Sequence, residues 1–210
     1  RLPLRFVLEN PRISAHARAI ADAEASGNVR PPEPPIKKVE RSEPIPLSFP
    51  QDGLWVIEQL HPENTTYNLP IFLTISGLID QNWLRRSIGA VVQRHEALRT
   101  VLRDFSGRPA QYIVDTVEVP FADVTLPATN NDVEVAEVFR TRLTEAAGEV
   151  MPLGSSPLFR VLVGVVDERR SYVGIIIHHA IFDGWSISVF LDDLAASYQN
   201  LEGGGDGVLP

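Results

Sequence analysis

The sequence feature that most constrains the fold is the stretch from Ile175 to Ser186. An apolar run with three consecutive isoleucines ends in His178 and His179, and Asp183 and Gly184 follow within five positions. Apolar strands usually end in turn residues and not in two titratable rings. Because successive side chains of a strand point to opposite faces, the two rings cannot both enter one cavity. We therefore expect one ring inside the scaffold and one presented to a site, which argues against an adjacent pair of metal ligands.

Hydrophobic periodicity along the rest of the chain predicts helices and strands in irregular alternation. In chain order the expected elements are a helix at 51–60, a strand at 70–76, a helix capped by Asp80, strands at 101–103 and 110–114 around Ser106-Gly107, a helix from Asn131 or Asp132, strands at 158–166 and 172–179, and a helix after Gly184. The last two strands are most simply an antiparallel hairpin. This order favours the α+β class, with helices covering a mixed β-sheet.

The first 45 residues divide into a short helical unit and a proline-rich segment. Residues 1–27 include an alanine-rich helix for which Ser14 is the expected N-cap, and they are too few to bury a core of their own. Between Val29 and Pro46, six prolines are mixed with charged residues, as is typical of an extended linker. We place the linker at 28–45 and the globular part at 46–210. Since the chain does not begin with Met, we expect it to be a piece of a longer protein.

Composition excludes several classes of function. A formal net charge of -8 argues against a nucleic-acid partner, and the absence of cysteine excludes disulfides, thiol catalysis and cysteine-ligated metals. No apolar run approaches the roughly 18 residues that a membrane span needs. We expect a soluble cytoplasmic protein with no membrane partner, no metal and no directly bound cofactor.

The histidine stretch has the frame His-His-x-x-x-Asp-Gly from His178 to Gly184. An arbitrary pair of adjacent histidines is more often packed or simply exposed than functional. This frame, however, closely resembles the signature of the condensation domains of nonribosomal peptide synthetases. The wider superfamily of CoA- and carrier-dependent acyltransferases keeps the shorter core His-x-x-x-Asp-Gly, which here runs from His179 to Gly184.

Two further stretches resemble motifs of the same family, in the same order. Residues 93–100 match the family's Arg-His-Glu-x-Leu-Arg-Thr motif completely, although alone they would be interpreted as the polar end of an amphipathic helix. Residues 46–55 resemble the opening motif Ser-x-Ala-Gln-x-Arg-Leu-Trp, with Pro50 in place of alanine and Gly53 in place of arginine. The Gly53 difference removes a positive charge that the family usually carries.

The resemblance covers roughly residues 46–200 and only the first half of the family's domain. It implies an N-terminal lobe of chloramphenicol-acetyltransferase-like fold, whose active site would lie in a tunnel closed by a C-terminal lobe that this chain lacks. Residues 1–27 look like the C-terminal tail of a peptidyl carrier domain, although any solvated amphipathic helix would look similar.

The resemblance also implies a reaction, its partners and its site. An acceptor amine would attack a thioester to form a peptide bond, with both substrates delivered on the phosphopantetheine of upstream and downstream carrier domains. His179 is the candidate that accepts the amine proton or holds the amine in line, and these two roles stay open. His178 would support the loop by hydrogen bonding. A backbone N–H near Gly184 and the Ser186 hydroxyl are candidate oxyanion donors.

Two features of the signature have expected structural roles. Gly184 fits a turn that needs a positive φ or a close approach by a pantetheine arm. Asp183 resembles the family's structural aspartate, which pairs with an arginine. Arg94 is the first candidate partner of Asp183 and Arg99 the second.

Two alternatives stay open. The first is an epimerisation domain, which shares His-His-x-x-x-Asp-Gly but has different neighbouring motifs. The second is a docking lobe that is catalytically silent. Heterocyclising relatives carry aspartates in place of the histidines, so His178 and His179 count against that branch. Residues 46–55 and 183–186 look most like domains that accept an L-configured donor. In every case we expect the isolated chain to be inactive, because half of the tunnel is absent.

Overall fold

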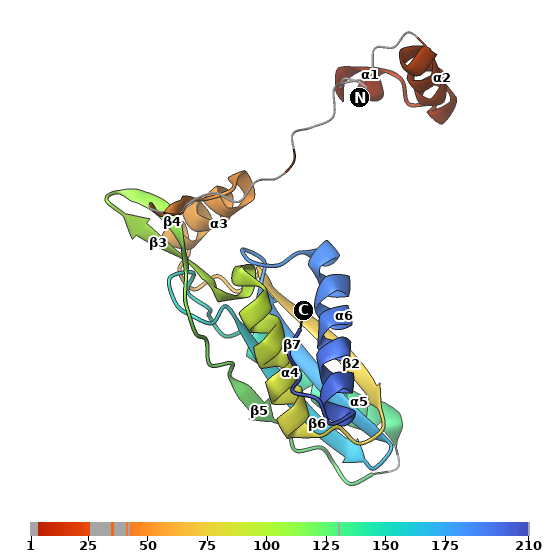
Figure 1. Cartoon of the computed structure of the whole chain (residues 1–210), viewed down its shortest axis with the longest axis vertical. Coiled ribbons are helices and arrows are strands. Elements are labelled where there is room, and N and C mark those ends of the chain that lie inside the picture. The colour runs from red at the N-terminus through yellow and green to blue at the C-terminus, as the bar shows by residue number, and fades with distance from the viewer. Residues whose placement is uncertain (1–3, 26–34, 36–40, 42, 130, 210) are drawn as a thin grey trace. The chain divides into compact units, whose positions relative to one another are not determined.

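The computed structural model describes residues 4–25, 35, 41, 43–129 and 131–209, and the chain divides into two compact units, 1–40 and 41–210 (Figure 1). Most of the linker predicted at 28–45 lies outside the described residues. The boundaries drawn from the sequence for the tail and the linker therefore stay predictions.

The first unit contains two helices, α1 (Leu4–Glu9) and α2 (Ile13–Ala25). Because α2 begins one residue before Ser14, the predicted N-cap at Ser14 is wrong. Every residue of α2 is described and none of them is buried, and Ile13 is 84% exposed. The apolar stripe of α2 is therefore not packed into a core within the described part of this unit.

A four-stranded sheet forms the centre of the second unit, in the order β2 (Asn68–Ser76), β7 (Arg170–His178), β6 (Phe159–Asp167), β5 (Phe121–Asp123). Strands β2 and β6 are antiparallel to β7, whereas β5 runs parallel to β6. The sheet is thus mixed, and β6–β7 is the predicted antiparallel hairpin. Asn68 at the start of β2 pairs with His178, so the histidines lie at the end of a central strand.

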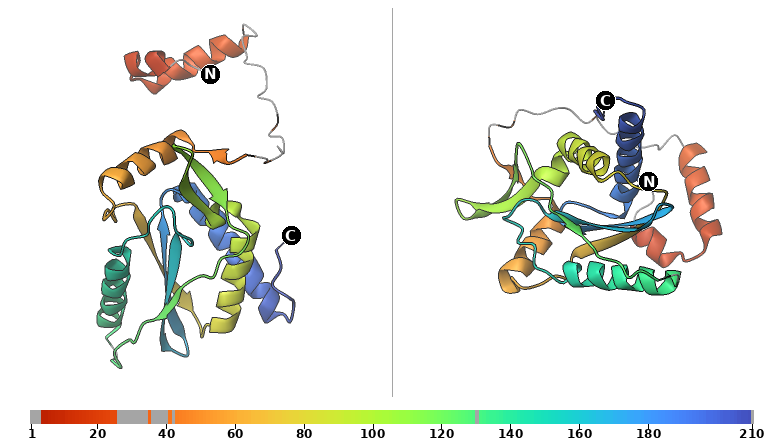
Figure 2. Two further views of the ribbon diagram at one scale, coloured as in Figure 1. Left: turned by 90° about the vertical axis from the view of Figure 1, so that its left-hand side faces the viewer. Right: turned by 90° about the horizontal axis from the view of Figure 1, so that it is seen from below.

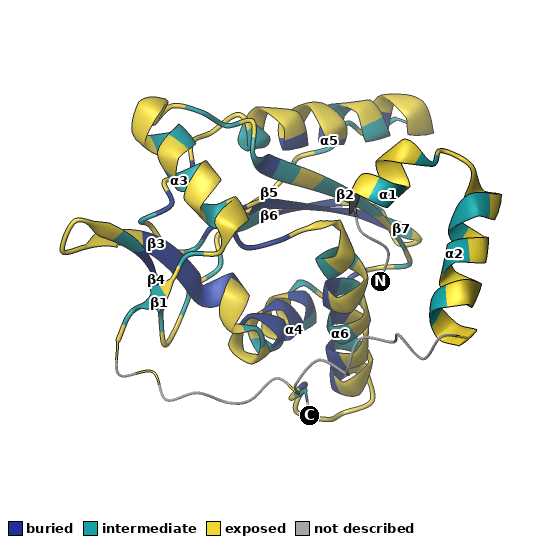
Figure 3. Cartoon of the chain, turned by 90° about the horizontal axis from the view of Figure 1, so that it is seen from above, coloured by how far each residue is buried: buried dark blue, intermediate teal, exposed yellow. Residues whose placement is uncertain are grey.

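Three helices cover the two faces of this sheet. Helix α5 (Asp132–Ala147) packs on one face, and α4 (Gln81–Arg94) and α6 (Gly184–Glu202) lie together on the other (Figure 2). With both faces covered, residues 171–178 of β7 are all buried, whereas the outward sides of the helices are exposed (Figure 3). This is the predicted α+β arrangement of helices over a mixed sheet.

The core has one layer on each side of the sheet. On the α5 side, the ring of Phe139 lies 5.6 Å from that of Phe72 and 5.5 Å from that of Tyr172, measured between centroids. Helix α5 approaches closely because Gly164 and Gly174 lie beneath it; a Cβ at Gly164 would come within 2.9 Å of Phe139.

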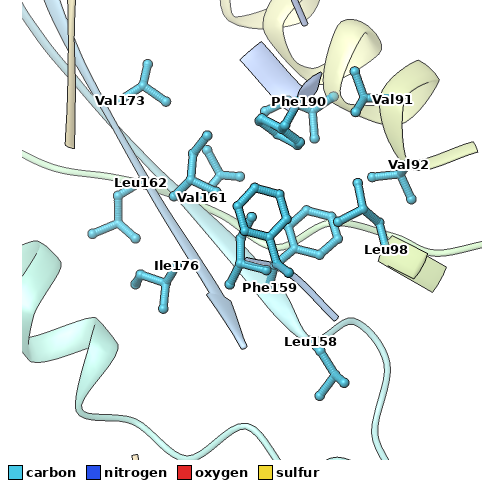
Figure 4. Packing of buried hydrophobic residues seen from close by; sticks show 14 of the residues in the cluster. Val91, Val92, Leu98, Leu158, Phe159, Val161, Leu162, Val173, Ile176 and Phe190 are labelled. Carbon is cyan, nitrogen blue, oxygen red and sulfur yellow. The ribbon is translucent and has the colours of Figure 1, made fainter. Parts of the chain in front are cut away.

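On the α4 side, Phe159 packs beside Leu98. Leu162 and Ile176 lie on the opposite side of the strands (Figure 4). The alternation of strand side chains thus fills both layers, and it fixes the position of the β7 end relative to the helices.

A second, three-stranded sheet contains β1 (Ile45–Pro46), β4 (Arg108–Ile113) and β3 (Thr100–Phe105), all antiparallel. Helix α3 (Phe49–Leu60) follows β1, and a 3-10 turn, η1 (Glu96–Arg99), connects α4 to β3. The β3–β4 hairpin turns at Ser106 and Gly107, as predicted. Thr100 of β3 and Gln111 of β4 in this sheet line the pocket that is described below.

Side-chain caps start α4 and α5 where the sequence predicts them. Asp80 Oδ1 accepts hydrogen bonds from the backbone N–H groups of Asn82 and Trp83, and Asn131 caps α5 through the N–H of Glu134. Both caps satisfy donors that a helix start leaves free. The start of α5 left open by the sequence is thus at Asp132, with Asn131 as its N-cap.

Candidate functional site

His178 is the last residue of β7 and belongs to the scaffold. It is 7% exposed, and its Nδ1 accepts a hydrogen bond of 3.0 Å from the backbone N–H of Ala180. That bond requires Nδ1 without a proton, so the neutral ring carries its hydrogen on Nε2. Burial, with the neighbouring His179 as a smaller cause, lowers the pKa of His178 to about 4. His178 is therefore a neutral ring that holds the following loop.

His179 turns to the other side and is exposed. Its backbone N–H donates to the carbonyl of Tyr67 (2.8 Å), and its Nδ1 lies 2.8 Å from the carbonyl oxygen of Phe182. Since a carbonyl oxygen only accepts, Nδ1 carries the proton, and in the neutral ring no described residue contacts the lone pair of Nε2. The two histidines thus hold opposite tautomers, and only His179 presents a base to an open space.

That open space is a pocket of about 430 Å³ between the end of β7, the start of α3 and the second sheet. Its lining residues are Ser48, Pro50, Gln51, Leu54, Ala97, Thr100, Gln111, His179, Ala180, Ile181, Phe182, Asp183 and Ser186. The pocket on the His178 side, beside Glu58 and Tyr67, measures only about 10 Å³. Room for a substrate therefore exists on the His179 side alone of this pair.

A smaller apolar pocket of about 140 Å³ adjoins the first. The two share Ala97, Ile181, Phe182 and Ser186, and the second is also lined by Trp185, which is 84% exposed. The site thus combines one imidazole lone pair with a neighbouring apolar surface.

Asp183 is the N-cap of α6, and this corrects its predicted role. Its Oδ1 accepts hydrogen bonds from the backbone N–H (2.8 Å) and the hydroxyl (2.6 Å) of Ser186. These bonds, that from the hydroxyl first, hold the pKa of Asp183 below its usual range. The predicted ion pair between Asp183 and Arg94 is wrong. The exposed carboxylate of Asp183 accepts the backbone N–H of Ser186 at the start of α6, and Arg94 pairs with another carboxylate.

Ser186 and Gly184 also differ from expectation. The Ser186 hydroxyl proton is donated to Asp183, so this group is not free to donate to an oxyanion. Gly184 is the first residue of α6, and it is not among the described glycines that have a positive φ. Of the two expected reasons for a glycine at this position, a positive φ is therefore excluded. A Cβ at Gly184 would meet nothing within 4 Å, so the room for a close approach by a pantetheine arm is present.

Arg94 pairs instead with Asp193 on α6. The Nε of Arg94 lies 3.2 Å from Asp193 Oδ2, and the same oxygen lies 2.6 Å from the Nε2 of His95. One carboxylate therefore joins the C-terminal end of α4 to α6. Arg94, which the sequence analysis paired with Asp183, thus contacts the middle of α6 instead.

Arg99, the second predicted partner of Asp183, is 8% exposed and bonds only to backbone among the described residues. Its guanidinium donates to the carbonyls of Val92 (3.2 Å), Val114 (2.7 Å) and Gln93 (3.3 Å). Arg99 therefore fixes the connection from α4 to β3 and does not reach Asp183.

Two glutamines of the pocket were not singled out from the sequence. Gln51 of α3 donates from Nε2 to the carbonyl of Ala180 (3.1 Å) and to Oε1 of Gln111 (3.2 Å). Gln111 of β4 donates in turn to the carbonyl of Pro46 (2.9 Å). Gln51 lies inside the opening motif, which was the one signal for it; Gln111 had none.

The described residues contain no group of three or more histidines, cysteines and carboxylates that could hold a metal ion. Within the same part of the chain, no helix is long and apolar enough to cross a membrane.

The model of the Condensation domain family matches residues 41–210, which include the whole of this site. The chain belongs to this family. The match begins where the second compact unit begins and contains both His178 and His179.

Curated relatives of this condensation domain are synthetases of peptides. The chain is 32% identical over 200 residues to phosphinothricin tripeptide synthetase PhsC of Streptomyces viridochromogenes, covering 94% of the chain and 18% of that protein. It is 33% identical over 165 residues to the dimodular nonribosomal peptide synthase of Bacillus subtilis, covering 79% of the chain and 7% of that protein. The chain thus spans a small part of the relatives that it matches.

Solved condensation domains share the fold. The starter condensation domain of rhizomide synthetase RzmA gives a TM-score of 0.69 at 22% identity over 78% of this chain and 39% of that one. The first condensation domain of the calcium-dependent antibiotic synthetase, with a substrate analogue, gives 0.69 at 24% identity, again over 78% of this chain and 39% of that one. The predicted chloramphenicol-acetyltransferase-like lobe is confirmed, and the chain spans well under half of each solved domain.

Proposed function

We propose that this chain is the half of a condensation domain that carries the reacting histidine in nonribosomal peptide synthesis. The complete domain forms an amide between a thioester donor and an amine acceptor, each carried on the phosphopantetheine of a carrier domain. The observation that supports this most strongly is the fixed tautomer of His179, whose Nδ1 donates to Phe182 and whose Nε2 is free beside a pocket of about 430 Å³.

In the proposed step the amine nitrogen attacks the carbonyl carbon of the thioester. A C–N bond forms and the C–S bond breaks, and the proton that the amine loses ends on the departing thiol. Nε2 of His179 accepts the hydrogen bond from the amine and so holds its lone pair toward the carbonyl carbon. The developing oxyanion takes a hydrogen bond from the backbone N–H of Gly184, at the start of α6. Ser186 is left out, because its proton is donated to Asp183.

The partners follow from the same proposal. Residues 1–27 are the C-terminal tail of an upstream carrier domain, and a second carrier domain delivers the acceptor. The remaining half of the domain closes the pocket beside His179 against water. The phosphopantetheine arms of the two carrier domains need space beside the backbone near His179. Gly184 leaves that space, because a Cβ there would meet nothing within 4 Å.

The experiment that tests this function uses the complete domain together with loaded donor and acceptor carriers. Mass spectrometry should detect the amide product with wild-type protein, and His179→Ala should lower its rate of formation by a factor of about 10² to 10⁴, the usual contribution of acid–base catalysis. His179→Gln separates two roles: its amide oxygen accepts a hydrogen bond but does not take a proton. An active Gln variant assigns a positioning role, and an inactive one assigns a base.

We also propose that the chain alone folds but forms no product, even with both loaded carriers. Reacting atoms must be held at about 3–3.5 Å, and one open face leaves both arms mobile. The exposed Trp185 and Phe49 should promote some self-association. Size-exclusion chromatography and the same product assay test this, and repeated turnover by the chain alone would disprove the need for the second half.

A further inference from the structure

We propose that Gln51 is a positioning residue that sets the loop of His179 through the carbonyl oxygen of Ala180. This inference rests on the proposed function for its consequence in catalysis, but its geometry is independent of it. Gln51 is half-buried and lies in the same pocket as His179, 129 residues away along the chain from the carbonyl that it binds.

The loop from His179 to Phe182 depends on a small number of hydrogen bonds. The N–H of Ala180 donates to His178, the N–H of Ile181 donates to the carbonyl of His178 (3.1 Å), and the His179 ring donates to Phe182. Among the described residues, the carbonyl of Ala180 receives its side-chain hydrogen bond from Gln51 (3.1 Å). Ala180 is 6% exposed, so without Gln51 this carbonyl would be buried with no partner in the loop.

An unpaired carbonyl at Ala180 would favour rotation of the peptide that joins it to Ile181. Such a rotation turns the N–H of Ile181 away from His178 and moves the Phe182 carbonyl that fixes the His179 ring. Gln51 therefore acts on the position of Nε2 through two residues of backbone, without having to touch the substrate.

The orientation of the Gln51 amide is fixed from both ends. Its Oε1 accepts the backbone N–H of Ser48 (2.9 Å), which is half of the capping box that starts α3. Its Nε2 donates to Ala180 and to Gln111, and Gln111 is held by its own bond to the carbonyl of Pro46. Since the oxygen serves the helix and the nitrogen serves the loop, one substitution separates the two functions.

That substitution is Gln51→Glu. A glutamate at this third helical position still accepts the N–H of Ser48, as capping boxes commonly use Glu or Gln. It cannot donate to Ala180, and it places a carboxylate oxygen against a carbonyl. A merely structural role in capping α3 would tolerate this change, whereas a positioning role would not.

The matched control is Gln111→Glu, which adds the same charge at the edge of the same pocket. Its carboxylate still accepts from Gln51 Nε2, so the bond from Gln51 to Ala180 is kept. The control loses the bond to Pro46 and places a carboxylate oxygen against that carbonyl, which is the same local change that Gln51→Glu makes at Ala180. A neutral second variant, Gln51→Met, removes both donors without adding charge and also removes the acceptor of the Ser48 N–H. It keeps the test valid if the glutamate variant does not fold.

The experiment uses the complete condensation domain with loaded carriers and measures single-turnover amide formation, carrier affinity, and the ¹⁵N resonances of the His179 ring. Gln51→Glu and Gln51→Met should slow the bond-forming step by about 10- to 100-fold, as expected for a misplaced catalytic group, with carrier affinity unchanged. Gln111→Glu should slow this step much less than either Gln51 variant, because the bond from Gln51 to Ala180 remains. The Nδ1–H signal of His179 should broaden or shift in the Gln51 variants alone.

Wild-type rates and unchanged His179 resonances in both Gln51 variants would overturn the inference, and so would equal losses in the Gln51 and Gln111 variants. If the wild-type domain forms no amide, the proposed function fails. In that case the ring resonances still decide whether Gln51 positions the loop.

Discussion

His178 and His179 are neighbours in the sequence, but the two sides of the β7 end that they occupy have opposite properties. On the His178 side the ring is buried, its Nδ1 accepts from Ala180, and the adjoining cavity measures about 10 Å³. On the His179 side the ring is exposed, its Nδ1 donates to Phe182, and the pocket measures about 430 Å³. The ring of His178 therefore packs into the scaffold, whereas the ring of His179 lies at the pocket with Nε2 unprotonated in its neutral form.

The difference comes from the pleat of the strand and from the loop that follows it. A strand that is covered by helices on both faces buries its last side chain, while the next residue leaves the sheet. The backbone of His179 is still held, since its N–H donates to Tyr67. An exposed ring on a fixed backbone is what a positioned base requires, and the buried neighbour supplies part of that rigidity.

The largest effect on stability should come from protonating His178. Its pKa is about 4 in the folded chain against 6.5 ordinarily, so the unfolded chain binds more protons between these values. Stability from this group is therefore full above about pH 6.5 and falls as the pH drops toward 4, by at most about 3 kcal/mol. Urea unfolding of the chain across this range measures the loss.

His178→Asn is the control for that measurement, since its side-chain oxygen can accept the Ala180 N–H but does not titrate. Burial raises the pKa of Glu58 in the same small cavity, so protonation of Glu58 favours the folded state at low pH. This effect opposes that of His178, and it is present in the wild type and in His178→Asn alike. The difference between the two proteins thus isolates His178. An identical pH dependence in both would show that His178 is not held neutral by burial.

The next effect should come from the cap on the His179 side of the loop. Asp183→Ala removes the acceptor for the Ser186 N–H and hydroxyl and should lower the urea midpoint of unfolding, because the start of α6 loses its cap. Asp183→Asn keeps a side-chain oxygen at the N-cap and should cost much less, since Asn and Asp cap about equally well. Denaturant melts of the two variants measure this. Equal damage from both would indicate that the charge of Asp183 matters more than its cap.

The smallest effect is a coupling energy that separates two possible partners of Arg94. Arg94→Ala and Asp193→Ala should couple by about 0.5–1 kcal/mol in a double-mutant cycle, because their side chains meet at 3.2 Å. Arg94→Ala and Asp183→Ala should be additive within about 0.5 kcal/mol. Strong coupling between Arg94 and Asp183 would show that these two side chains meet, and it would contradict the partner assigned to Arg94.

The sequence predicted the order of the elements apart from α1, β1, η1 and β5, and it predicted the β6–β7 hairpin, the Asp80 cap and the opposite orientation of the two histidines. Each of these follows from local periodicity or from capping chemistry, which act over a few residues. The cap at Asp183 was also readable, since an aspartate directly precedes the helix, but the expectation of an ion pair concealed it.

Contacts between distant elements could not be predicted in this way. The bond of Gln51 to Ala180 depends on how α3 docks against the loop, and that of Asp193 to Arg94 depends on the register between α4 and α6. No pattern in either segment encodes the position of the other. Packing of whole elements, and not the motif itself, decides these partners.

The measurement that tests the central claim most directly is the amide-forming rate of His179→Asn in the complete domain. The asparagine amide can donate to Phe182 as Nδ1 does, so the loop is kept, but nothing replaces Nε2. We predict a folded domain, normal carrier binding, and a single-turnover rate lower by a factor of about 10² to 10⁴. A rate within a few-fold of wild type would contradict the assignment of Nε2 of His179 as the group that meets the amine.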